Sequence, residues 1–173
     1  MSLSTHTTQS GFLLPSIHSA PPFFTQQPNL ATQSILTEQW TRLILAYARY
    51  RRLFILRIED AETTGNEWDE VLRNERINRR ILPSHLSHIL ASMVATNVAA
   101  YEPAKQTRTV LLYWRLPEEW AEVLHNWATS TAQLNTILTF YDITDPPIES
   151  ELSGIPLIGV ADGEGVRIFA GGR

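Results

Sequence analysis

The stretch PSHLSHILASMVATNVAAYEPAKQTRTVLLYWR, residues 83–115, decides the fold of this chain. Its first half carries apolar residues at helical spacing, at Leu86, Ile89, Leu90, Met93 and Val94. Pro83 suits the first position of a helix, where a backbone N–H is not needed, so the pattern predicts a helix over 83–97. Residues 99–101 and 109–115 are rich in strand-forming residues and flank a polar turn, which predicts a β-hairpin.

Upstream of this stretch, two further helices and a strand are predicted. One apolar helical face follows Asn29 and comprises Leu36, Trp40, Leu43, Ile44 and Tyr47. Residues 53–56 predict a short strand, and residues 67–80 predict a second, mostly charged helix. The order helix, strand, helix, helix and hairpin is that of a winged-helix domain, which we place over residues 30–115.

The second half of the chain repeats part of this order. Pro117 and two glutamates open a helix whose apolar face is Trp120, Val123, Leu124 and Trp127. Residues 136–143 are β-rich, and a final hairpin is expected from 157–161 and 166–169, with an Asp162-Gly163 turn. Only one helical turn fits between these parts, near 149–152. We therefore predict a mixed α/β (α+β) protein of two tandem winged-helix domains, the second (116–173) lacking a helix.

The N-terminal region precedes both domains. Residues 1–20 are rich in Ser, Thr and Gln, and we expect a disordered tail. Residues 21–29 begin with Pro21-Pro22-Phe23-Phe24, which predicts an extended backbone with two exposed rings. Burying one such ring on a partner is worth about 2–3 kcal/mol before costs. These four residues are therefore our candidate partner-binding site; the alternative is that the rings fold back onto their own domain, against Trp40.

Composition argues against two classes of protein, those that bind phosphate groups and those that span a membrane. The chain carries a net charge of -4, whereas proteins that grip phosphates usually carry a positive excess. It has no cysteine, which suits a reducing compartment, and no apolar run approaches the ~20 residues of a membrane-spanning helix. We expect a cytoplasmic protein.

Catalytic and cofactor sites are not predicted. His85 and His88 are three apart on a helix, but no further ligand lies within helical reach, so packing or surface roles are favoured over a metal. The glutamates after Pro117 suit a helix start, and the Gly-rich 162–165 suits a hairpin turn rather than a phosphate loop. We therefore expect a non-enzyme without cofactor or metal.

A winged helix raises the alternative of a nucleic-acid-binding regulator. The helix over 83–97 would enter the major groove, yet it contains no Lys or Arg. A basic patch remains available at Arg73, Arg76, Arg79 and Arg80. Such a run is more often the solvated face of a helix, so nucleic-acid binding is the second hypothesis.

Several motifs, in order, resemble the small tandem winged-helix subunit of the ESCRT-II complex. They are Pro21-Pro22-Phe23-Phe24-Thr25 with Gln27-Pro28-Asn29, Leu112-Tyr113-Trp114-Arg115 with Pro117-Glu118-Glu119-Trp120, Thr139 to Thr144, and Asp162 to Phe169. The resemblance implies a scaffold for sorting ubiquitinated cargo into multivesicular endosomes.

The resemblance also implies partners. The family is present twice in its complex and docks to two larger winged-helix subunits through the Pro-Pro-aromatic segment. It recruits an ESCRT-III subunit through the second domain and reaches the endosomal membrane only through the complex. This chain departs from the family in running from Ile155-Pro156 directly into Leu157, where family members place a long apolar helix.

Overall fold

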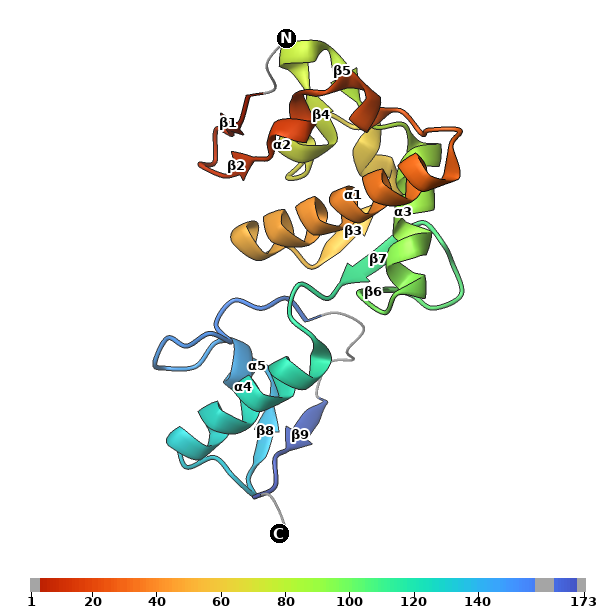
Figure 1. Ribbon diagram of the computed structural model, residues 1–173. Helices are drawn as coiled ribbons and strands as arrows, with labels where there is room; N and C mark the ends of the chain where they lie inside the picture. The colour runs from red at the N-terminus through yellow and green to blue at the C-terminus, as the bar shows by residue number, and fades with distance from the viewer. Residues whose placement is uncertain (1–3, 158–163, 171–173) are drawn as a thin grey trace. The chain divides into compact units, whose positions relative to one another are not determined.

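The computed structural model describes residues 4–157 and 164–170 and divides into two compact units (Figure 1). Unit 1 is Met1–Trp114 and unit 2 is Arg115–Arg173. The division lies one residue from the domain boundary expected from the sequence. No helix within the described residues is both long and apolar enough to span a membrane.

Two long helices frame unit 1. Helix α1 (Leu30–Arg51) begins where the Asn29 side chain accepts a hydrogen bond from the Thr32 N–H, and it ends at Arg52, which has a left-handed backbone. Such a cap satisfies an amide that would otherwise lack a partner. Helix α3 (Pro83–Ala95) starts with its proline, as the sequence predicts.

A three-stranded antiparallel sheet closes unit 1. Its strands are β3 (Ile55–Arg57), β6 (Ala99–Tyr101) and β7 (Thr109–Leu112), in the order β3-β7-β6. β6 and β7 form the predicted hairpin, and β3 pairs with β7. The helices and this sheet bury one core, whose fully enclosed side chains include Trp40, Ile44, Tyr47, Leu56, Leu72, Ile81, Leu86, Ile89, Leu90 and Met93.

The prediction of a helix over 67–80 is wrong. The structure has one helical turn, α2 (Asp69–Leu72), followed by a small hairpin of β4 (Arg73–Asn74), the 3₁₀ turn η4 (Glu75–Ile77) and β5 (Arg79–Arg80). Residues 73–80 are too polar to give a helix an apolar face. The hairpin instead brings Leu72 and Ile81 together in the core, where the Ile81 N–H donates to the Leu72 carbonyl at 2.9 Å.

Residues 4–20 are folded against the rest of unit 1 rather than forming the expected disordered tail. Strands β1 (His6–Thr7) and β2 (Leu13–Leu14) pair, and the 3₁₀ turn η1 (Ser16–Ser19) follows. Ser10 donates two hydrogen bonds to the Glu70 carboxylate, and Phe12 meets Tyr47 edge to face at 5.3 Å. These contacts join residues far apart in the chain, so local composition could not reveal them.

Unit 2 is smaller and less complete. Helix α4 (Pro117–Ser130) is followed by β8 (Ile137–Thr139), the short helix α5 (Phe140–Thr144) and β9 (Gly165–Arg167). β8 and β9 pair antiparallel, and α5 replaces the second half of the β-rich stretch predicted over 136–143. The predicted turn at 162–163 and most of its first strand lie outside the described residues. Described residues between α5 and β9 form a turn at 151–154 and no helix.

Candidate partner-docking surface

The four candidate docking residues form one 3₁₀ turn, η2 (Pro21–Phe24), immediately before α1. Two of them are exposed to solvent and two are buried. Pro21 and Pro22 are exposed, whereas Phe23 and Phe24 retain 0% and 3% of their accessible surface. The two prolines therefore form the outward surface of the turn, and the two rings anchor it to unit 1.

Trp40 of α1 is the platform for this anchor. Its indole stacks flat on Phe23, with 4.2 Å between ring centroids and 4° between planes, and meets Phe24 edge to face at 5.5 Å. The indole N–H also donates to the Phe23 carbonyl at 2.8 Å. Because a buried indole N–H needs a partner, this bond fixes the turn as well as the ring.

His18 connects the turn to α2 and the β4–β5 hairpin. Its Nε2–H donates to the Val71 carbonyl at 2.7 Å, and its ring meets Phe24 edge to face at 5.0 Å. The Asn74 amide donates to the His18 carbonyl at 2.8 Å and to its Nδ1 at 3.3 Å. Burial lowers the pKa of His18, which keeps the ring neutral and lets Nδ1 accept from Asn74.

The chain leaving the turn is held by a glutamine. The Gln27 side-chain amide donates to the carbonyls of Pro22 and Thr25, at 3.0 and 2.9 Å. The Pro22 carbonyl also accepts from the Thr25 N–H at 3.2 Å, so the glutamine adds a second bond to this carbonyl and a bond to the next part of the chain. The turn is therefore fixed from three sides: by Trp40 beneath it, by His18 before it and by Gln27 after it.

Burial of Phe23 and Phe24 corrects two expectations. The rings are not exposed, and the backbone of Pro21-Pro22 is a 3₁₀ turn rather than extended. The observed arrangement is the alternative in which the rings pack against Trp40, because the apolar face of α1 presents the flat indole of this residue. His18 and Asn74 were not recognised from the sequence, since only the fold brings them to the turn.

The two histidines of α3 have different environments. His85 is buried, with its ring 6.4 Å from that of Trp40, and burial lowers its pKa although a backbone hydrogen bond to Phe24 opposes this. His88 is exposed. Within residues 4–157 and 164–170, no group of three or more His, Asp or Glu side chains could hold a metal ion. His85 supports the turn as a packing residue.

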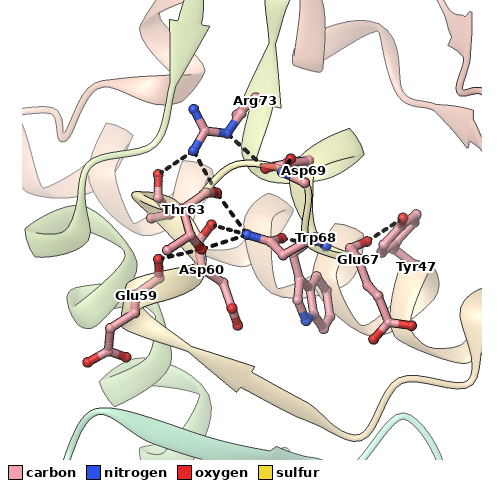
Figure 2. Close-up of polar contacts among 11 residues, drawn as sticks. Tyr47, Glu59, Asp60, Thr63, Glu67, Trp68, Asp69 and Arg73 are labelled. Carbon is pink, nitrogen blue, oxygen red and sulfur yellow. Dashed lines mark hydrogen bonds and ion pairs between the residues drawn. The ribbon is translucent and has the colours of Figure 1, made fainter.

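The predicted basic patch does not form on one helix face. Arg73 is tied to Asp69 of α2 at 2.9 Å and to the Thr63 carbonyl at 2.8 Å (Figure 2). Arg79 and Arg80 are exposed on β5. The helix that a DNA-binding winged helix would insert into the major groove, α3, carries no basic side chain other than its histidines.

Comparison with known proteins now decides the family. A family described as ESCRT-II complex subunit matches residues 17–156. The chain belongs to the ESCRT-II family. A vacuolar protein-sorting-associated protein 25 of Drosophila melanogaster is 32% identical over 142 residues, covering 82% of this chain and 77% of the relative. Its counterpart in Danio rerio is 25% identical and covers 91% of this chain and 99% of the relative.

Solved structures of the ESCRT-II family share the fold. A crystal structure of subunit VPS25 of the endosomal trafficking complex ESCRT-II matches with a TM-score of 0.71 and 22% identity, over 83% of this chain and 81% of that one. A chain of the endosomal complex ESCRT-II (VPS22/VPS25/VPS36) matches with a TM-score of 0.69 and 20% identity, over 86% and 84%. The tandem winged-helix fold expected from the sequence is confirmed.

Family membership makes this chain a structural subunit of the ESCRT-II type, as the sequence motifs indicate. The alternative of a nucleic-acid-binding regulator is not favoured.

Proposed function

We propose that this chain docks to two larger winged-helix subunits through Pro21 and Pro22, and that it acts there as a scaffold without catalysis. The solved relative comes from a complex of VPS22, VPS25 and VPS36, which identifies the kind of partner. In this proposal Phe23 and Phe24 hold the turn, and the prolines make the contact.

The single observation that carries the proposal is the division of η2 into an exposed proline pair and a buried aromatic pair. A loose segment would lose conformational entropy on docking. This turn is already fixed by Trp40 and Gln27, so less entropy is lost when a partner binds. Proline rings suit an aromatic-lined groove, which is the usual receptor for proline-rich segments.

The proposal also covers the role of unit 2 and the location of the protein in the cell. We place the link to an ESCRT-III subunit on unit 2, whose exposed apolar side chains include Ile137, Tyr141 and Ile148, at 74%, 66% and 78% exposure. Exposed apolar groups of this size favour a protein partner. The chain then resides in the cytoplasm and reaches the endosomal membrane through its complex.

The test is assembly of the complex with a Pro21→Ala/Pro22→Ala variant. Co-expression of the unaltered chain with the two larger subunits is expected to give a mass corresponding to two copies of this chain per core, measured by light scattering after size exclusion. The double variant should lose at least about tenfold in affinity, equivalent to about 1.4 kcal/mol. Both prolines are exposed, so the fold should be retained, which circular dichroism checks.

A matched control is Pro147→Ala, which alters an exposed proline of unit 2. It should assemble as the unaltered chain does. Normal assembly of the Pro21→Ala/Pro22→Ala variant would exclude the prolines as the contact.

A further inference from the structure

A serine ties the hairpin of β1 and β2 to the rest of unit 1. Ser10 lies in the turn between these two strands (Figure 1). Its hydroxyl donates to one oxygen of the Glu70 carboxylate at 2.5 Å, and its backbone N–H donates to the other oxygen at 2.9 Å. The two residues are 60 positions apart in the chain, so this Ser10–Glu70 clasp is a tertiary contact.

The acceptor of the clasp is a negatively charged carboxylate. The Tyr47 hydroxyl also donates to Glu70, at 3.1 Å, and the Arg51 guanidinium lies 3.8 Å away. Although burial raises it, the hydrogen bonds, led by those from Ser10, lower the pKa of Glu70 overall. The clasp therefore needs a proton on the Ser10 hydroxyl and a charge on Glu70.

Beyond the clasp, the hairpin is held by apolar contacts. Phe12 meets the Tyr47 ring edge to face, and Leu14 is buried. Each strand has only two residues, and a hairpin this short is not stable by itself. Segments with few contacts open locally at small cost in free energy. Gln9 and Gly11, on either side of Ser10, are exposed, so opening of the hairpin makes the serine accessible to an enzyme.

We propose that Ser10 is a phosphorylation site, and that its modification releases the β1–β2 hairpin from unit 1. The reagents are ATP and a protein serine kinase. The bond from Ser10 Oγ to the γ-phosphorus forms as the bond from that phosphorus to the bridging β–γ oxygen breaks. ADP leaves, and the hydroxyl proton passes to the carboxylate base of the kinase. The proposal goes beyond the docking function and does not depend on it.

Phosphorylation removes a donor and adds charge at the same position. The esterified Ser10 oxygen no longer carries a proton, and the phosphate brings about 1.5 to 2 negative charges at pH 7. At the position of the clasp this phosphate meets the negatively charged Glu70, so the two groups repel each other. Arg51 supplies one positive charge and already donates to the Tyr47 hydroxyl at 3.1 Å, so it does not balance both anions. The closed hairpin is therefore disfavoured.

The released segment ends before the docking turn. His18 keeps its bonds to the Val71 carbonyl and to Asn74, and neither bond involves Glu70. The Trp40 indole likewise continues to hold Phe23. Phosphorylation should therefore free residues 4–14 and leave η2 in place.

The experiment is hydrogen exchange of the full chain, measured by mass spectrometry, with phosphoserine encoded at position 10 or at position 4. Ser4 is exposed and its carbonyl accepts from the Ser19 hydroxyl, so it provides the same charge in the same segment but outside the clasp. Phosphoserine at position 10 should speed exchange over residues 4–14 at least about tenfold, and phosphoserine at position 4 less than about twofold. Exchange over residues 18–24 should stay as in the unmodified chain.

The outcomes of this comparison differ in meaning. Equal acceleration by both phosphoserines would replace the clasp by a general effect of charge and overturn the proposal. Slower exchange with phosphoserine at position 10 would show that Arg51 receives the phosphate and would overturn it as well. Acceleration that extends through residues 18–24 would overturn the limited release, and thermal melts exclude global unfolding as its cause.

A Glu70→Gln variant tests the charge directly. The amide of the glutamine donates to a phosphate instead of repelling it, so the variant with phosphoserine at position 10 should recover part of the lost protection. The same variant without phosphate should exchange faster than the unaltered chain over residues 4–14, because a charged acceptor is lost. Undiminished release in the phosphorylated Glu70→Gln chain would overturn repulsion by Glu70 as the cause.

Occupancy of the site is a separate measurement. The chain is isolated from its own cells with phosphatase inhibitors present, and peptides that contain Ser10 are analysed by mass spectrometry. Phosphate on Ser10 is expected. Its absence under every growth condition, with Ser10 peptides fully covered, would overturn the assignment of the site.

Discussion

Unit 1 and unit 2 have the same type of fold but very different cores. In unit 1 three large aromatic side chains are fully enclosed: Trp40, Tyr47 and Phe23 have 0% exposure. In unit 2 the cluster of buried apolar residues consists of Leu138, Ile143 and Leu152, with Trp120 and Trp127 only half-buried against it. The same pattern of apolar residues at helical spacing therefore gives a closed core in one unit and an open one in the other.

The difference follows from what each helix packs against. α1 is covered by α3, by the sheet and by η2, which adds two phenylalanines to the core. α4 has a short helix and a two-stranded ladder available in the described residues. A small domain buries a smaller fraction of its surface, so each missing element costs it proportionally more stability. The comparison suggests that unit 1 is the stable part of the subunit.

The largest expected effect is that of Phe23→Ala on unit 1. Removing a fully buried phenylalanine leaves a cavity, and about 3–5 kcal/mol of unfolding free energy should be lost. Chemical denaturation followed by tryptophan fluorescence measures this loss, because Trp40 stacks on the deleted ring. A variant with unchanged stability would show that Phe23 is not anchored on Trp40.

A smaller effect is expected for Trp120→Ala in unit 2. This ring is half-buried and carries Arg115 over its face at 4.6 Å, so truncation should cost roughly 1–2 kcal/mol. Hydrogen exchange resolved by unit separates this loss from unit 1, which should keep its protection. A loss as large as that of Phe23→Ala would show that unit 2 is as well packed as unit 1.

The third expected effect is a pH dependence of the stability of unit 1. Burial lowers the pKa of both His18 and His85 below the ordinary 6.5. Near and below that pH the unfolded chain therefore binds more protons than the folded chain does. The free energy of unfolding of unit 1 therefore has its full value above about pH 6.5 and falls as the pH drops below it. Denaturation of unit 1 at pH 7.5 and 5.5 measures the difference.

A His18→Gln variant provides the control for that measurement. It should flatten the pH dependence, because one of the two groups no longer titrates. An unaltered slope in His18→Gln would place the titration elsewhere.

Much of the fold was predictable from local pattern. The helices over 30–51, 83–95 and 117–130 follow from apolar spacing with prolines or a cap at their starts, because these signals act within one or two turns. The hairpin of β6 and β7 follows from two short strands around a polar turn. The motifs before α1 and around α4 also indicated the ESCRT-II family.

Only the tertiary structure decided the state of the docking residues. The sequence places two prolines and two phenylalanines side by side, and its spacing is equally compatible with exposed or buried rings. Trp40 decides between the two, because its flat indole stacks on Phe23 and its N–H donates to the Phe23 carbonyl. The same holds for Ser10 on Glu70 and for the approach of β5 to η2: contacts between residues distant in the chain depend on the packed fold, which local composition and spacing do not encode.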